Sequence, residues 1–190
     1  KELDQQKYFT YLRTVKKHID LFREENIPLQ AELNVMQQQY GIISGKMTVE
    51  VNGQEYTLQQ ATKFLENNDR GLRESVYRKI SERRLKDKEE LNSLFSKLIE
   101  KRHQVAINAG FANYRDYKFA EMGRFDYTKE DCFQFHEAVK QQVMPLVNNV
   151  YEKKKKKLGV DSLRPWDLEA YPADEKPLNP FKTGEELVEK

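Results

Sequence analysis

Apolar residues recur with helical spacing over the first forty residues of the chain. Between residues 1 and 25 they step by four, three, four and three positions, which places them on one face of a helix. These positions are Tyr8, Leu12, Val15, Ile19 and Phe22. Asn26 suits a left-handed helix end, Pro28 suits the first turn of a second helix, and Gly41 would end that helix. Because the link is short, we expect the two helices to pack as an antiparallel hairpin.

The one strongly alternating pattern follows this pair of helices. Met47, Val49 and Val51 alternate with polar residues, and Asn52-Gly53 comes next. Asn-Gly is the strongest short signal for a two-residue turn, because both turn positions need a positive φ. The pattern predicts a small β-hairpin near residues 46–57, and Thr57 suits the N-cap of a helix after it.

A long helix is predicted from Leu72 to Ala109, where the chain contains neither proline nor glycine. Asp69 suits its N-cap and Gly110 its end. A shorter helix is expected over residues 113–122. Another should begin at Thr128, where Asp131 three residues on resembles a capping box.

The helix that begins at Thr128 is the last long one and contains Pro145, which predicts a kink in the preceding turn. It ends at Leu158-Gly159. Four prolines then mark a loop, and Thr183 begins a final helix. The prolines are Pro165, Pro172, Pro177 and Pro180. The fold class is therefore predicted to be all-α, mainly long antiparallel helices, with one small β-hairpin.

We expect residues 1–190 to form one helical segment with four parts. They are a helical hairpin with the β-hairpin and a short helix (1–68), long helices (69–159), a proline-rich loop (160–182) and the start of a helix (183–190).

Composition excludes several classes of protein. The 33 Lys and Arg residues nearly balance the 31 Asp and Glu residues, so no strong field points to nucleic acid or to a membrane surface. No apolar run is long enough to cross a bilayer. One cysteine excludes an internal disulfide framework and fits a reducing compartment.

A zinc site is the first chemistry to consider, because His136-Glu137 begins like the helical HExxH motif. The second histidine would fall at Lys140, a cation that repels a metal ion. His18 and His103 lie far away in sequence, without partners at ligand spacing. We therefore expect no metal ligand and no catalytic residue in this chain.

Three other features have a functional and a structural interpretation. Lys153–Lys157 is either a phosphate-binding patch or a solvated helix end. The acids around Trp166 and the pair Cys132 and His136 are either acid, base or nucleophile candidates or ordinary loop and core residues. These acids are Asp161, Asp167 and Glu169. An aromatic group, Tyr114, Tyr117 and Phe119, either lines a peptide channel or belongs to the core.

Several strings, in order, resemble the oligoendopeptidase F branch of the thimet-oligopeptidase-like zinc metallopeptidases. The match covers most of the chain and rests on helix caps and packing positions rather than on chemistry. The strings are Gly45–Leu58, Asp69-Arg70 with Arg73-Glu74, Glu100–Tyr117, Thr128 with Val143-Met144-Pro145, and Leu158-Gly159 with Leu163–Asp167.

The resemblance implies a mostly helical, cytoplasmic oligopeptidase whose two lobes enclose a channel for short peptides. It also implies a zinc ion held by two histidines and a glutamate, with a second glutamate as base. This chain has no HExxH, so none of those residues carries over to it. The chain opens without methionine and stops inside a predicted helix. We therefore expect an inert upstream portion of such an enzyme, with zinc bound beyond Lys190.

Two alternatives remain at the level of sequence. A helical protein-interaction module would bind a partner through aromatic grooves, and a nucleic-acid binder would use Lys153–Lys157. Peptide preference, channel-lining residues and oligomeric state do not follow from the sequence.

Overall fold

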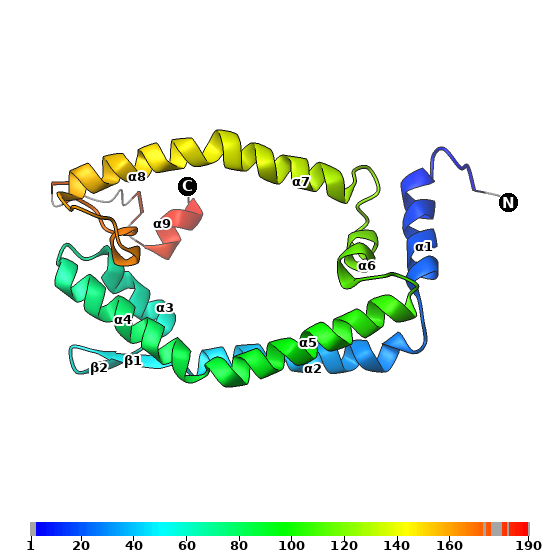
Figure 1. Cartoon of the computed structure of the whole chain (residues 1–190), viewed down its shortest axis with the longest axis horizontal. Helices are drawn as coiled ribbons and strands as arrows, with labels where there is room; N and C mark the ends of the chain where they lie inside the picture. The colour runs from blue at the N-terminus through cyan, green and yellow to red at the C-terminus, as the bar shows by residue number, and fades with distance from the viewer. Residues whose placement is uncertain (1–2, 173, 176–179, 182, 190) are drawn as a thin grey trace. The chain divides into compact units, whose positions relative to one another are not determined.

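The computed structural model describes residues 3–172, 174–175, 180–181 and 183–189. These residues form two compact units, each assembled from two separate stretches of the chain (Figure 1). The first unit contains Lys1–Lys46 and Lys86–Val139, and the second contains Met47–Leu85 and Lys140–Lys190. Each unit has its own hydrophobic core.

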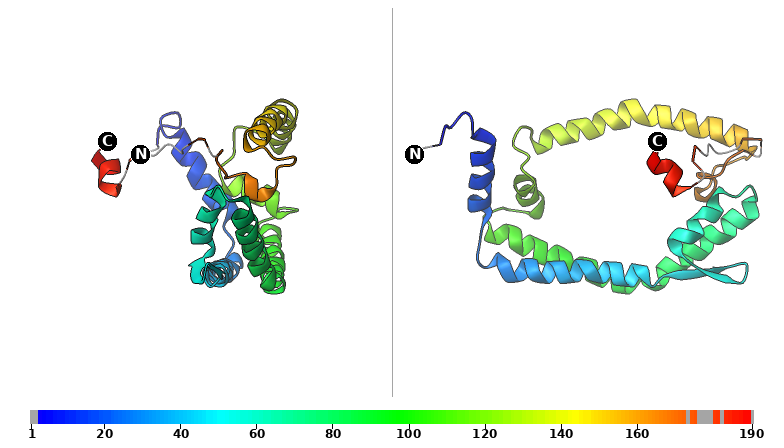
Figure 2. Two further views of the ribbon diagram at one scale, coloured as in Figure 1. Left: turned by 90° about the vertical axis from the view of Figure 1, so that its left-hand side faces the viewer. Right: turned by 180° about the vertical axis from the view of Figure 1, so that it is seen from behind.

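The first unit is built on two long antiparallel helices, α2 (Asn26–Gly45) and α5 (Lys88–Asn108), which lie side by side (Figures 1 and 2). Leu33 of α2 packs against Leu94 and Leu98 of α5 in the core of this unit. The short helix α6 (Tyr114–Glu121) also packs on α5, and α7 (Lys129–Ala138) follows it in the chain. Gly110 ends α5 with φ of 86°, as predicted.

The predicted antiparallel hairpin of the first two helices is wrong. Helix α1 (Phe9–Leu21) contacts α6, where the Lys17 ammonium donates a hydrogen bond of 3.0 Å to the carbonyl oxygen of Glu121. Helix α2 begins at Asn26 and continues to Gly45, past the predicted end at Gly41. The apolar stripe of α1 contains no buried residue, so it does not form a core with α2.

Asn26 explains the different start of α2. It is not in a left-handed conformation but buried at the first position of the helix. Its amide nitrogen donates to the carbonyl oxygen of Val105 at 3.0 Å, and its amide oxygen accepts from Asn108 at 2.8 Å. A side chain with one donor and one acceptor toward α5 fixes where α2 begins.

The second unit contains the β-hairpin, with β1 (Thr48–Val51) paired antiparallel to β2 (Gln54–Thr57). Asn52 and Gly53 have φ of 54° and 78°, as the turn requires. Thr57 and Gln60 form a capping box for α3 (Leu58–Thr62), which continues into the 3₁₀-helix η1 (Lys63–Glu66). The hairpin, its turn and the cap are confirmed.

The long helix predicted from Leu72 to Ala109 is two helices, α4 (Arg70–Lys86) and α5, divided at Asp87. Its predicted cap is confirmed, since the Asp69 carboxylate accepts hydrogen bonds from the backbone N–H groups of Gly71 and Leu72. The division follows from packing. Val76 and Ile80 of α4 belong to the core of the second unit, whereas α5 belongs to the core of the first. Leu85, the apolar residue nearest the break, is exposed.

Pro145 distorts the helix that contains it. A π-helical turn, η2 (Val139–Val143), separates α7 from α8 (Met144–Leu158), because proline lacks an N–H group and its ring clashes with the preceding turn. Helix α7 begins with the predicted Thr128–Asp131 capping box, and α8 ends at Gly159 with φ of 63°.

The loop after α8 contains the 3₁₀-helix η3 (Pro165–Asp167), and α9 (Gly184–Glu189) follows Thr183 as predicted. Pro177 lies outside the described residues. The predicted fold class, all-α with one β-hairpin, is confirmed. Within the described residues, no helix combines the length and the apolar character needed to cross a membrane.

Replacing Asn26 by Ala is expected to destabilise the chain by about 1–3 kcal/mol, because it leaves the buried polar groups of α5 without their partner. Urea unfolding followed by circular dichroism measures the change. Asn34→Ala on the exposed face of α2 is the control and should stay within about 0.5 kcal/mol of the original. Equal effects of the two substitutions would contradict the assigned role of Asn26.

Candidate functional site

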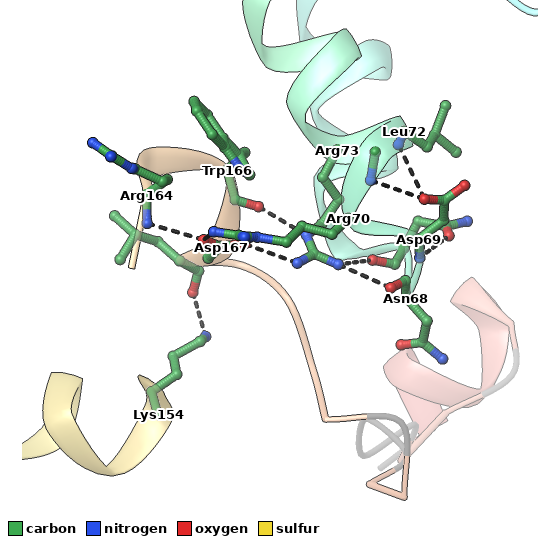
Figure 3. A network of polar contacts seen from close by, with 12 residues as sticks. Asn68, Asp69, Arg70, Leu72, Arg73, Lys154, Arg164, Trp166 and Asp167 are labelled. Atoms are coloured by element: carbon green, nitrogen blue, oxygen red, sulfur yellow. Dashed lines mark hydrogen bonds and ion pairs between the residues drawn. The ribbon is translucent and has the colours of Figure 1, made fainter. Parts of the chain in front are cut away.

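Asp167, at the end of η3 in the second unit, has a carboxylate that accepts four hydrogen bonds (Figure 3). Its side chain is fully buried. Arg70 of α4 donates to both carboxylate oxygens, from Nε to Oδ1 at 3.0 Å and from Nη2 to Oδ2 at 2.9 Å. This two-bond geometry is the strongest arrangement of an arginine and a carboxylate.

Arg73 is the second cation that binds Asp167, and it is itself buried. Its Nη2 donates to Oδ1 of Asp167 at 2.9 Å, and its Nε donates to the carbonyl oxygen of Trp166 at 2.9 Å. Its Nη1 donates to the carbonyl oxygens of Asn67 and Asn68 at 2.8 and 3.1 Å. Arg73 therefore joins the entry to α4, the first turn of α4 and the loop at η3 (Figure 3).

Local rules of chain geometry bring these groups together. The Asp69 cap starts α4 at Arg70, and the spacing of three residues places Arg70 and Arg73 on one face of the helix. Pro165 suits the first position of η3, and Arg164 is the N-cap residue before it. The backbone N–H of this N-cap donates to Oδ2 of Asp167, three residues further on, at 2.9 Å. We call Arg70, Arg73 and Asp167 the arginine–aspartate cluster.

The electrostatics of the cluster keep the carboxylate ionised. Burial alone would raise the pKa of Asp167, but hydrogen bonds from Arg70, the Arg164 backbone and Arg73 hold it at about 2. Hydrogen bonds occupy both of its oxygens. A carboxylate so strongly stabilised in its charged form is a poor general base. The cluster therefore has the properties of a structural lock rather than of a catalytic group.

Lysines of the run Lys153–Lys157, at the end of α8, also contact the loop that contains η3. Lys154 donates to the carbonyl oxygen of Leu168 (Figure 3), and Lys157 forms an ion pair of 2.5 Å with Glu175. Nζ of Lys155 lies 3.7 Å from Oε2 of Glu152 on the same helix. Three of the lysines in Lys153–Lys157 therefore contact the chain itself, which favours the helix-end interpretation over a phosphate-binding patch.

The histidines do not fit a zinc site. His136 is exposed on α7 with Lys140 one turn further on, His18 is on α1, and His103 is on α5. Throughout the described ranges, no three His, Cys, Asp or Glu side chains gather as metal ligands would. That the chain contributes no metal ligand stays a prediction from the sequence.

The remaining candidates are dispersed. Cys132 is half-buried and His136 is exposed with its ring centroid 6.5 Å from those of Phe133 and Phe135. Asp161 and Glu169 are exposed, unlike Asp167. In the aromatic group, Tyr117 is buried in the first core and stacks edge-on against Phe111 at 5.7 Å.

Sequence reasoning missed the roles of Arg73 and Asn26, the two buried polar partners that join distant segments. The signal for Arg73 was its position three residues after Arg70 behind a helix-capping aspartate. That signal places a cation at a helix start, but it does not identify Asp167, 94 residues away, as the partner.

Replacing Asp167 by Asn is expected to lower stability by about 3–5 kcal/mol, because Arg73 then remains buried without a counter-charge. Urea unfolding followed by circular dichroism measures this effect. Asp161→Asn, at an exposed acid of the same loop, is the control and should change stability by less than about 0.5 kcal/mol. A loss below about 1 kcal/mol for Asp167→Asn would show that the cluster does not hold this unit together.

The cluster also predicts an acid-dependent loss of stability. The pKa of Asp167 is lowered from 3.8 to about 2 on folding, so its contribution is complete above about pH 4. It falls as the pH drops through 2 and is on the order of 2 kcal/mol in total. The stability advantage of the original chain over Asp167→Asn should therefore shrink by about 2 kcal/mol between pH 4 and pH 2. A difference that stays constant over this range would contradict the low pKa.

The sequence model of peptidase family M3 matches residues 63–189, a range that contains every residue of the arginine–aspartate cluster. A search of curated proteins finds no match.

Solved structures share the fold. One is named as an oligoendopeptidase F from Bacillus anthracis str. Ames, with 21% identity and a TM-score of 0.81 over 87% of this chain and 31% of that one. Another, PZ peptidase A with an inhibitor, has 21% identity and a TM-score of 0.81 over 86% of this chain and 29% of its own. A third, also named as an oligoendopeptidase F, has 22% identity and a TM-score of 0.83 over 87% and 30%.

This chain thus spans about a third of the length of the structures that it matches. The likeness to oligoendopeptidase F that the strings indicated is confirmed for the fold. Since the family match extends over more than half of the sequence, the chain belongs to peptidase family M3.

Proposed function

We propose that this chain is the upstream helical portion of a zinc-dependent oligopeptidase that hydrolyses short peptides in an internal channel. Its own part is to form channel wall and to exclude folded proteins, and it is inert alone. The observation that carries the proposal is the family M3 match over residues 63–189, within which the polar residues form a lock and not a reactive centre. The zinc ligands of the parent enzyme then lie outside this chain.

The exposed faces of several helices support a role within a larger protein. Helices α1, α7 and α8 contain no buried residue. Phe135 and Leu146 are 68% and 64% exposed, and Ile19 is 68% exposed. Apolar side chains that repeat along helices without cover are typical of surfaces that contact more protein. In the proposed function they contact the rest of the parent chain.

The same faces favour a second candidate function, a helical protein-interaction module. In that case the partner is a separate protein, and the chain needs no peptidase partner domain. Translation of the DNA on both sides of the coding segment distinguishes the two, because the peptidase proposal requires a downstream HExxH in the same reading frame.

The full reading frame is expected to cleave short unstructured peptides, to lose this activity when a chelator removes zinc, and to recover it when zinc is restored. The 190-residue chain alone should show no zinc-dependent cleavage. Release of fluorescence from an internally quenched peptide measures both. Zinc-dependent cleavage by the isolated chain, or its absence from the full-length protein, would contradict the proposal.

A further inference from the structure

A groove along the helix pair α2 and α5 of the first unit has no role so far. Its volume is about 540 Å³. Its walls are apolar and amide side chains with one cation, and no carboxylate lines it. The lining residues are Gln37, Tyr40, Leu91, Asn92, Leu94, Phe95, Leu98 and Arg102. We call it the Arg102 groove.

Two aromatic side chains of the Arg102 groove are open to solvent. Tyr40 is 60% exposed and Phe95 is 58% exposed. They project from α2 and α5 respectively, so each helix supplies one aromatic wall. Aromatic side chains beside a few polar groups are typical of sites that hold a small ligand.

Arg102 supplies the only charge in the groove lining. Its guanidinium lies over the Tyr114 ring, 5.9 Å from the ring centroid. Among the described carboxylates, none forms an ion pair with Arg102, whereas its neighbour in sequence, Lys101, pairs with Glu32. A half-buried guanidinium without a counter-ion favours an anionic ligand group.

The spacing of the lining residues sets the length of the groove. On α5 they run from Leu91 through Phe95 and Leu98 to Arg102, at successive turns. The eleven helical steps from Leu91 to Arg102 rise about 16 Å, which equals about five residues of an extended peptide. The charge lies at one end of this length and the apolar side chains fill the rest.

We propose that the Arg102 groove binds the carboxyl-terminal end of a short peptide, with the α-carboxylate on Arg102 and apolar side chains against Phe95 and Tyr40. The charge complementarity between one cation and a terminal carboxylate selects this occupant. The inference deepens the proposed function and rests on it, since it assigns a substrate-end subsite to the channel wall.

The test is calorimetric titration of the 190-residue chain with the peptide Gly-Ala-Leu-Ala-Phe as free acid and as carboxyl-terminal amide. The free acid should bind about tenfold tighter, as the loss of one charge-assisted pair implies. Arg102→Gln should abolish that preference. Phe95→Ala should weaken both peptides equally and keep the preference.

The matched control is Lys97→Gln, which removes an exposed cation from the same helix. Lys97 lines a different groove of the α2 and α5 pair, together with Glu90. This variant should keep the tenfold preference. Equal binding of acid and amide, no binding of either, or an equal loss in Lys97→Gln would overturn the proposal. Decanoate that binds as tightly as the free acid would show a fatty-acid site instead.

Two further results separate this inference from the proposed function. In an active full-length enzyme, Arg102→Gln should raise KM for the free-acid peptide and leave kcat unchanged. If the full-length enzyme is active but Phe95→Ala lowers its stability, Phe95 packs against other parts of that chain. The groove is then covered, and only this inference fails. If the full-length protein is inactive while the groove still selects the free acid, the proposed function fails alone.

Discussion

Burying the carboxylate of Asp167 is possible only because every oxygen on it has a donor. Arg70, Arg73 and the Arg164 backbone replace the water that the carboxylate loses, and Arg73 in turn donates to three carbonyl oxygens. Loss of one donor or acceptor from this buried group would strongly destabilise the fold, because it leaves a buried charge without its partner. These hydrogen bonds therefore fix the first turn of α4 relative to the loop at η3. Trp166 packs on Tyr77 beside them.

The features that could be predicted from sequence depend on residues close together in the chain. The Asn52-Gly53 turn and the Thr57 cap act within a few residues, and so does the glycine that ends α8. The features that could not be predicted depend on distant partners. Asn26 starts a helix because of acceptors and donors 79 and 82 residues away. The break at Asp87 separates apolar stripes that belong to two different cores.

The candidate site shows the same division. The sequence places Asp167 among three acids near the only tryptophan, but its residue type fits a base and an ion pair equally well. Only the position of Arg70 and Arg73 decides between the two. The strings Asp69-Arg70 with Arg73-Glu74 and Leu163–Asp167 lie far apart in the sequence. In the structure they meet, so they mark one tertiary contact of this chain rather than two independent features.

Trp166 has a consequence for how this molecule is observed. It is the only tryptophan in the chain, and it lies between the Tyr77 ring at 5.6 Å and the Arg78 guanidinium at 5.3 Å. Its indole emission therefore comes from the second unit alone, next to the arginine–aspartate cluster. Far-ultraviolet circular dichroism, in contrast, averages over the helices of both units. A difference between the two optical signals during unfolding would thus measure, without any label, how far the two cores melt independently.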